Sequence, residues 1–384
     1  MRKNIMLSVL LISWLVPGVL AGQTRREIRI PDIQEYKTLI GDFHMHTLFS
    51  DGNVWPTIRV EEAYREGLDV IAITDHVETR YKDFRKDIPV KYNRAYELAL
   101  PRARELGILL VKAAEITRDM PPGHLNALFI KDEAPLIDKD PFKAIELAVK
   151  QGAFIVWNHP GWDRQLKEDG IVRWYEEHTR LFENGWLNGI EVVNWDEYYP
   201  EAFDWALEKN LTLLGNSDSH SRIDFDFDSL KGQRRPYTLV FVREPTLKGV
   251  REAFESRRTL IYFQDSILGR EEWLRVFFEG CLDMITNVLS SNESGRALIR
   301  ISNDSDIPVM IQTAGDTDEY TLTESLEVLP HTTEILRLRF NKGTKQGVHN
   351  LKIPVTVTNF LKNPRESLNS TLEIKVINNR KKTD

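Results

Sequence analysis

The sequence predicts an α/β fold built on a parallel sheet or barrel, followed by a small antiparallel β-sandwich. Strand-like and helix-like stretches alternate from about residue 37 to 265, as in repeated strand–helix units. Beyond about residue 266, short alternating segments are separated by Pro, Gly and Asn, which is typical of antiparallel strands. With 41% hydrophobic and 28% charged residues among 384, the chain is globular rather than disordered.

In the first region, predicted as one barrel domain over residues 22–265, strands are placed on short apolar blocks such as Val70-Ile71-Ala72-Ile73. These strands cover residues 39–43, 69–74, 108–113, 125–130, 153–157, 189–193, 211–214 and 237–242. Helices are predicted over residues 60–67, 90–106, 141–151 and 246–256. Pro141 suits a helix start, because the first turn needs no backbone N–H donor from that residue.

The second region begins with a connecting segment, residues 266–289, in which residues 271–288 are predicted to be helical. Residues 290–384 then form the predicted β domain. Its strands are expected at residues 297–301, 309–312, 334–340, 351–358 and 371–377.

The first 21 residues are predicted to be a secretory signal peptide. Arg2 and Lys3 precede a mostly apolar run over residues 5–20, and Val19-Leu20-Ala21 offers a cleavage site before Gly22. The run is short for a membrane span and contains Pro17 and Gly18, so we expect no stable span. The mature protein is therefore expected to be secreted or periplasmic.

Charge and cysteine content narrow the possible functions. The net charge is -7 and the isoelectric point is near 5.8, which argues against a non-specific nucleic-acid or anionic-membrane binder. Cys281 is the single cysteine, so an intramolecular disulfide and a thiolate metal cluster are excluded. Any metal would be held by His, Asp and Glu. The oligomeric state is left open.

Polar residues gather at the predicted strand ends. Parallel barrels form their active sites at the C-terminal ends of the strands, and six of the nine histidines lie at or beside a strand end. His124 differs, because it precedes its strand and would reach the site from a loop. The candidate donors are His44, His46, Asp51, His76, Glu115, His124, His159, Asp218 and His220. Nine donors exceed the coordination of one ion, so two or three divalent ions are expected.

These motifs resemble the PHP (polymerase and histidinol phosphatase) family over about residues 37–265. The matching segments are His44-Met45-His46-Thr47, Ser50-Asp51-Gly52, Ile73-Thr74-Asp75-His76, Glu115, Gly123-His124, Asn158-His159-Pro160 and Asp218-Ser219-His220. The resemblance implies a distorted (β/α)7 TIM-like barrel with a trinuclear site of Mn, Zn or Fe. The signal peptide and the trailing β domain make the chain similar to secreted Sb-PDE-type phosphodiesterases within that family.

The resemblance also implies three ligand sets. His44, His46, Glu115 and Asp218 would hold the first ion. Glu115, as the bridge, would hold the second with His124 and His159. Asp51, His76 and His220 would hold the third, with Asp51 standing where several relatives have a histidine.

Such a site is suited to hydrolysis, and we expect a small-molecule phosphoester to be attacked by a hydroxide that bridges two ions. Asp218 is a candidate proton shuttle and Glu115 the bridging carboxylate. Arg118 and Arg80 are candidate phosphate contacts, because guanidinium pairs with phosphate through two hydrogen bonds. Trp162 and Trp195 follow strand ends and are candidates for an apolar substrate wall.

Three alternatives to a phosphodiesterase remain. A phosphomonoesterase would act on histidinol-phosphate-like or nucleotide substrates. The same nucleophile would also hydrolyse a carboxylic ester, lactone or carbamate. A non-enzymatic glycan- or protein-binding module is the third, although only Tyr320, Phe340 and Phe360 supply aromatic rings to residues 290–384.

Overall fold

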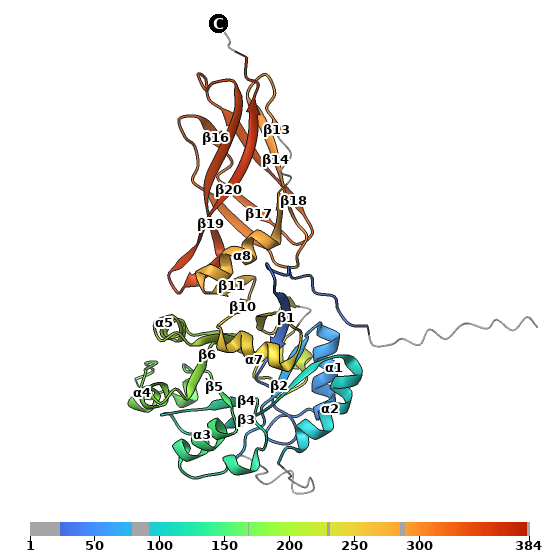
Figure 1. The fold of residues 1–384 in the computed structure, drawn as a ribbon, viewed down its shortest axis with the longest axis vertical. Coiled ribbons are helices and arrows are strands. Elements are labelled where there is room, and N and C mark those ends of the chain that lie inside the picture. Colours follow the sequence, from blue (N-terminus) through green and yellow to red (C-terminus); the bar gives the residue numbers. More distant parts are fainter. Residues whose placement is uncertain (1–23, 79–91, 168, 229–230, 285–288, 382–384) are drawn as a thin grey trace, which may run out of the picture.

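The computed structural model describes residues 24–78, 92–167, 169–228, 231–284 and 289–381. The predicted signal peptide and Arg80 lie outside these residues. Figure 1 shows a lower part in which helices flank a curved sheet and an upper part made of long strands, with one helix where the two meet. The predicted α/β domain followed by an antiparallel β domain is therefore confirmed.

Parallel strands form most of the lower part. The ladders β1–β2, β2–β3, β5–β6 and β6–β8 are parallel, whereas β4 pairs antiparallel with both β3 and β5. β9 runs antiparallel to β1. The strands are β1 (Lys37–Asp42), β2 (Val70–Ile73), β3 (Leu109–Ile116), β4 (Leu125–Leu128), β5 (Phe154–Trp157), β6 (Leu187–Asn194), β8 (Thr212–Asn216) and β9 (Tyr237–Val242). A two-residue strand, β7 (Glu197–Tyr198), pairs with the end of β6.

The sheet curls back on itself at its C-terminal edge. Residues 43–46 continue β1 and run between the ends of β2 and β8. The backbone N–H of Thr74 donates to Met45 O at 2.8 Å on one side. On the other side, the N–H of His46 donates to Ser219 O at 3.0 Å, and that of Asp218 donates to His44 O at 2.8 Å. The segments that follow β1, β2 and β8 are thereby held together.

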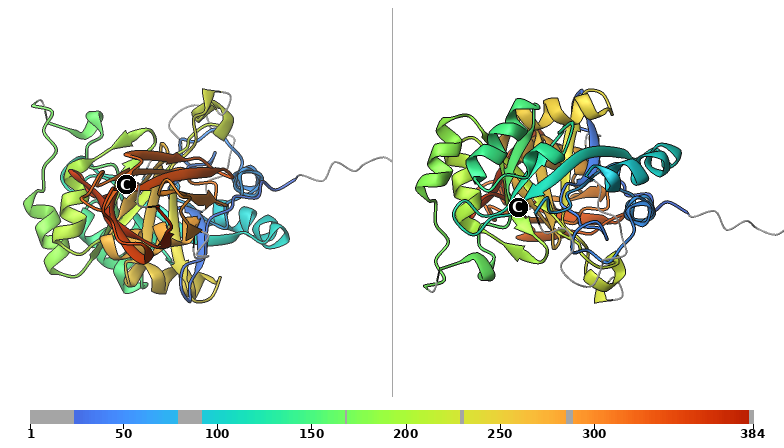
Figure 2. Two further views of the ribbon diagram at one scale, coloured as in Figure 1. Left: turned by 90° about the horizontal axis from the view of Figure 1, so that it is seen from above. Right: turned by 90° about the horizontal axis from the view of Figure 1, so that it is seen from below.

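Helices lie around the outside of these strands (Figure 2). They are α1 (Pro56–Glu66), α2 (Arg94–Leu106), α3 (Pro141–Lys150), α4 (Glu176–Glu183), α5 (Pro200–Glu208), α6 (Ile223–Asp226) and α7 (Leu247–Glu255). α1 begins four residues before the predicted position, because Pro56 occupies its first turn, and it ends at Gly67, whose φ of 87° only glycine adopts easily. β2 and β5 are buried along their whole length, as expected for strands covered on both faces.

The predicted connecting helix is shorter than expected. α8 (Glu271–Cys281) ends where Leu282 becomes extended, and β12 (Leu282–Met284) then pairs with the end of β14. Ladder hydrogen bonds to β14 thus replace the helical ones that the apolar pattern predicted. The expected helix over residues 271–288 is wrong in its second half as far as Met284, and residues 285–288 lie outside the described part.

The upper part has two sheets. One has the order β12-β14-β18-β16, and the other contains β13, β20, β19, β15 and β17. Buried and exposed residues alternate along β14, as expected when one face packs on the opposing sheet. The strands are β13 (Leu289–Ser290), β14 (Arg296–Asn303), β15 (Val309–Thr313), β16 (Tyr320–Leu322), β17 (Ser325–Val328), β18 (Thr333–Phe340), β19 (Gly347–Asn363) and β20 (Glu366–Asn378).

A hairpin that the sequence analysis missed joins the two parts. β10 (Thr259–Phe263) pairs with β9, and β11 (Ser266–Gly269) pairs with both β10 and β19. Phe360 of β19 is fully buried with its ring 6.1 Å from that of Phe277. Backbone hydrogen bonds and apolar contacts therefore dock the β domain on the barrel. No helix of the described residues has the length and apolar character needed to cross a membrane.

Candidate metal centre

The nine predicted donors lie together at one edge of the curved sheet. Each is placed by a strand end or by the loop that follows one, so the topology, rather than local sequence, brings them together. His44 and His46 follow β1, Asp51 precedes α1, His76 follows β2, Glu115 lies in β3, His124 precedes β4, His159 follows β5, and Asp218 and His220 follow β8.

The direction of β4 explains how His124 reaches this edge. Because β4 runs antiparallel to β3 and β5, its first residue lies beside the last residues of its neighbours, with Leu125 opposite Trp157. His124 therefore needs no long loop. Glu115 was expected just after a strand, but β3 extends to Ile116 and includes it.

Three donor atoms form a compact triangle. His44 Nε2 and His46 Nε2 are 3.1 Å apart, and they lie 3.1 and 2.9 Å from Asp218 Oδ1. Two ligands of a tetrahedral ion with bonds of about 2.05 Å are separated by about 3.3 Å. The triangle thus has the dimensions of one face of a metal coordination sphere.

Glu115 lies at the middle of the cluster. Its Oε1 is 3.0 Å from His124 Nδ1, 3.6 Å from His44 Nε2 and 3.7 Å from His159 Nε2. Its Oε2 is 2.7 Å from His76 Nδ1 and 3.6 Å from His46 Nε2. Since its two oxygens face different imidazoles, the Glu115 carboxylate occupies a bridging position.

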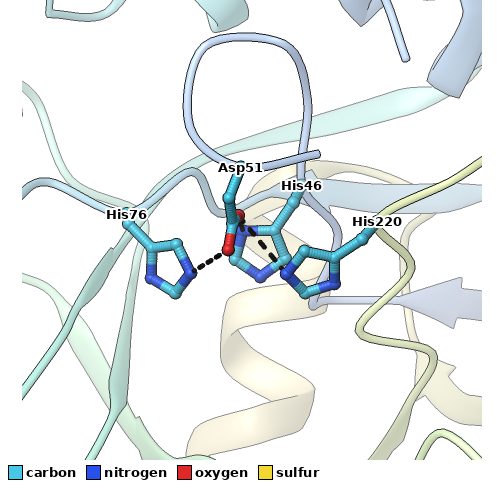
Figure 3. Close-up of side chains that lie close together, drawn as sticks. All are labelled: His46, Asp51, His76 and His220. Atoms are coloured by element: carbon cyan, nitrogen blue, oxygen red, sulfur yellow. Dashed lines mark ion pairs between the residues drawn. The ribbon is translucent and has the colours of Figure 1, made fainter. Parts of the chain in front are cut away.

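Asp51 organises the outer side of the cluster. Figure 3 shows its carboxylate directed at the imidazoles of His76, His46 and His220, which come from three separate segments. Asp51 Oδ2 is 3.3 Å from His76 Nε2, and Oδ1 is 3.3 Å from His220 Nε2 and 3.7 Å from His46 Nδ1.

The geometric groups overlap with the implied ligand sets without reproducing them. Among the described residues, four groups have donor atoms within 4.8 Å of one another: His46, Asp51, His76 and His220; His44, His46 and Asp218; His44, Glu115 and His159; and His76, Glu115 and His124. His46 joins the implied third set. His124 and His159 fall into different groups that share Glu115.

The carboxylates of the cluster are held in their charged form. Burial would raise the pKa of Glu115, but His76, His124 and His44 outweigh it and hold that pKa well below its usual value. Burial likewise opposes ionisation of Asp218, whose pKa is nevertheless lowered by His44 and His46. Burial, together with His220 and His76, lowers the pKa of His46 to about 4. The carboxylates are therefore anionic near neutral pH, and His46 is a neutral donor.

The cluster fits a metal on chemical grounds. The buried atoms Glu115 Oε2, His124 Nδ1 and Asp218 Oδ1 make no well-aligned hydrogen bond within the described part of the chain, although each lies close to another donor atom of the cluster. Burying polar atoms without partners is costly unless a cation satisfies them. Imidazole nitrogens mixed with carboxylate oxygens suit Mn, Zn or Fe.

Glu191 is a supporting residue that the sequence analysis missed. This buried carboxylate of β6 accepts from His44 Nδ1 at 2.9 Å and from the backbone N–H of His159 at 2.8 Å. The side-chain amides of Asn194 and Asn216 each donate to it at 2.9 Å. Its one signal in the sequence is an acidic residue inside an otherwise apolar strand.

Other buried polar residues hold the loops that carry the donors. Asp75 accepts from Thr47 N at 2.7 Å and from Ser50 Oγ at 2.6 Å, which shapes the loop before Asp51. Asn158 donates to Glu115 Oε1 at 2.8 Å and so orients that carboxylate, a role that the sequence left open.

Arg59 links two of these loops. Its guanidinium is fully buried and donates to the backbone oxygens of His46 and Ser219, at 2.9 Å each, while it pairs with Glu62 at 2.9 Å.

Arg118, Trp162 and Trp195, the described candidates for substrate contact, lie outside the group of nine donors. Arg118 pairs with Glu78 and donates to Thr117 O at 2.6 Å, so its guanidinium is engaged beside the cluster rather than directed at the nine donors. The ring of Trp162 lies edge-on, 5.2 Å from His159, and is placed to form a wall. Trp195 packs 5.2 Å from Phe227 in the lining of a neighbouring cavity of about 330 Å³.

Comparisons with known proteins agree with this architecture. A family model described as an Ig-like domain matches residues 285–373. A crystal structure from Bacteroides vulgatus ATCC 8482, described as a two-domain protein containing a predicted PHP-like metal-dependent phosphoesterase, is 43% identical. It covers 92% of this chain and 100% of its own, with a TM-score of 0.85. No curated protein matches the chain.

Two more distant structures cover 47% of this chain. A metal-dependent phosphoesterase from Bifidobacterium adolescentis ATCC 15703 is 19% identical over 88% of its own length, with a TM-score of 0.37. An amidohydrolase from Chromobacterium violaceum, with bound sulfate and no metal, is 16% identical over 87% of its length, with a TM-score of 0.36.

Proposed function

This chain belongs to the PHP-like metal-dependent phosphoesterases, and on that premise we propose that it is a secreted phosphodiesterase. Family membership makes it a hydrolase of phosphoester bonds. The preference for diesters, the ion identities and the secretion are the proposed parts. The narrower similarity to secreted Sb-PDE-type enzymes belongs to the same proposal.

The convergence of the nine donors carries the proposal. Asp218 with His44 and His46 would hold one ion, and Glu115 would be shared between ions. Divalent ions at these positions would neutralise the non-bridging oxygens of a phosphoester and lower the pKa of a coordinated water toward neutrality.

The protein side chains supply orientation and proton transfer. Asp218 Oδ1 lies 3.1 and 2.9 Å from the Nε2 atoms of His44 and His46, whereas Oδ2 lies 3.9 Å from His159 Nε2 and would accept a proton from the attacking water. Asn158 and Glu191 fix Glu115 and His44, so that these groups need not reorganise during the reaction.

The charge around the site supports a diester as substrate. Asp51, Glu115 and Asp218 pair with histidines, and within the described residues no Lys or Arg forms an ion pair with any of the three. A monoester carries close to two negative charges near pH 7, whereas a diester carries one. With no Lys or Arg paired to these carboxylates in the described residues, the ions would carry most of the neutralisation, and the singly charged ester asks for less of it.

Turnover of paired substrates tests this function. The purified chain loaded with Mn or Zn is expected to hydrolyse bis-p-nitrophenyl phosphate faster than p-nitrophenyl phosphate, and both faster than p-nitrophenyl acetate. EDTA should abolish the activity, and added metal should restore it. A higher rate on the monoester or the acetate would favour the corresponding alternative, and full activity without metal would contradict metal-dependent hydrolysis.

Secretion has its own experiment. The basic residues 2–3, the apolar run over residues 5–20 and the small residue Ala21 support cleavage before Gly22. N-terminal sequencing of protein recovered from the periplasm or medium should read from Gly22. Uncleaved protein confined to the cytoplasm would contradict this prediction.

A further inference from the structure

A group of four arginines lies on the outer surface of the β domain, far from the metal centre along the chain. We call this surface the arginine face and define it by Arg296 and Arg300 of β14 and Arg337 and Arg339 of β18. All four are exposed, whereas the alternate residues of both strands, such as Ile299 and Leu338, are buried in the sandwich. The pleat therefore directs the four guanidinium groups outward together.

The register brings like charges side by side. Arg296 lies directly opposite Arg339, and the next outward row places Leu298 opposite Arg337. Directly opposed like charges destabilise a sheet. A cluster of this kind is unfavourable for the domain alone, but it becomes favourable when an anion lies across it.

The four guanidinium groups have no protein partner in the part of the chain that the structure describes: none forms an ion pair or a side-chain hydrogen bond. Some other cations of the same domain are paired. Lys352 lies 2.8 Å from Glu373, and Lys381 lies 2.5 Å from Glu293. The arginine face thus gathers four unpaired guanidinium groups on one surface of a protein whose net charge is -7.

This face is hollowed rather than flat. A trough of about 840 Å³ runs over it and is lined by hydroxyl, amide and guanidinium groups together with Leu298, which is 60% exposed. Its polar lining includes Ser290, Asn292, Thr321, Thr323, Arg296, Arg337 and Arg339. The residues that line it include no aromatic ring, so a ligand here would be held by charge and hydrogen bonds rather than by the ring stacking that binds neutral glycans.

We propose that the arginine face binds a linear acidic polysaccharide. Guanidinium groups pair with carboxylate or sulfate through two hydrogen bonds, and the hydroxyl and amide groups beside them match sugar hydroxyls. Arg337 and Arg339 are two residues apart on one strand, a spacing of roughly 6.7 Å, which suits repeated charges along an extended polymer.

The trough favours a glycan over two other polyanions. Single-stranded nucleic acid is bound largely by stacking of bases on aromatic rings, and the lining of this trough supplies none. A lipid surface would call for several apolar side chains, whereas Leu298 is the one large apolar residue exposed in this lining.

Binding of defined polymers to the full chain tests the proposal. We expect biolayer interferometry to show binding to immobilised polygalacturonate that weakens as salt rises, and no binding to neutral dextran. The double variant Arg337→Gln/Arg339→Gln should weaken binding by about tenfold, because each exposed pair contributes a few-fold. The matched control Lys352→Gln/Lys375→Gln removes the same charge from the other sheet and should change binding by less than about twofold.

Each remaining outcome decides the question. The proposal is overturned if polygalacturonate does not bind, or if the control variant loses as much affinity as the arginine variant. It is also overturned if a dT20 oligonucleotide or phosphatidylglycerol vesicles bind more tightly than polygalacturonate. If the first double variant does not fold, Arg296→Gln/Arg300→Gln replaces it with the same expectation. Hydrolysis of bis-p-nitrophenyl phosphate should be unchanged in these variants, so the result is independent of the proposed function.

Discussion

Replacing Glu191 by glutamine should disable the metal centre although Glu191 is not one of the nine donors. Oε1 accepts from His44 Nδ1 and Asn216 Nδ2, and Oε2 accepts from His159 N and Asn194 Nδ2, all at 2.8–2.9 Å. In Glu191→Gln, the new NH2 group faces two of these donors in either orientation of the amide. Asn216 is not free to adapt by flipping, because its Oδ1 accepts from the backbone N–H of Phe43 at 2.8 Å.

Two buried donors would thus lose their acceptor. At about 1–3 kcal/mol for each, the variant should lose roughly 2–6 kcal/mol of stability. Losing the residue that accepts a hydrogen bond from the second ring nitrogen of a ligating histidine typically lowers metal affinity by about 10–100-fold. Metal content by mass spectrometry, the thermal midpoint and bis-p-nitrophenyl phosphate turnover should therefore all fall. The control Glu201→Gln removes an exposed carboxylate of α5 and should change none of the three. A Glu191→Gln protein with normal metal content and normal turnover would refute this reasoning.

Three further predictions follow from other parts of the molecule. Arg118→Ala should lower kcat/KM for bis-p-nitrophenyl phosphate by less than about tenfold, because its guanidinium is engaged by Glu78; a loss of a thousandfold would place Arg118 on the substrate. Burial lowers the pKa of His178 to about 4 in the folded chain. Between pH 6.5 and 4 the unfolded chain therefore binds one more proton at this residue than the folded chain does. Urea denaturation should show the free energy of unfolding decreasing by up to about 1.4 kcal/mol for each pH unit as the pH is lowered through that range. His178→Gln should reduce this slope by the share of one proton, with His46 still contributing, and an unchanged slope would contradict the assignment. Burial raises the pKa of Cys281 to about 12, so Ellman's reagent should modify that thiol only after denaturation; rapid labelling of the folded chain would show the thiol to be accessible.

The nine candidate donors could be chosen from the sequence because each lies near a short apolar block, and the structure brings them together at one edge of the sheet. His44 and His46 lie beyond the Leu39–Ile40 block, and His76 lies beyond Val70–Ile73, so their place at one edge could be inferred from alternation and strand ends. Which donors group together could not be predicted, since it depends on side-chain directions in three dimensions.

Other features depend on partners distant in the sequence. The reversed direction of β4 is set by its pairing with β3 and β5, and a four-residue apolar block does not encode direction. Arg59 is recognisable only by what it touches, because a guanidinium in a helix has no local signature of burial, and the acidic residue in an apolar strand that marks Glu191 does not reveal its partners. The strand β11 was missed because only Ile267 and Leu268 of its four residues are large and apolar, and because it belongs to a hairpin at the junction.

The pairing of β11 with both β10 and β19 has a mechanical consequence. Ile267 and Leu268 are in register with Phe360 and Leu361, so the ladder passes from the barrel into the β domain without a flexible hinge. Turning one body against the other would break these backbone hydrogen bonds. The metal centre and the outer strands of the β domain are therefore held at a fixed separation and orientation.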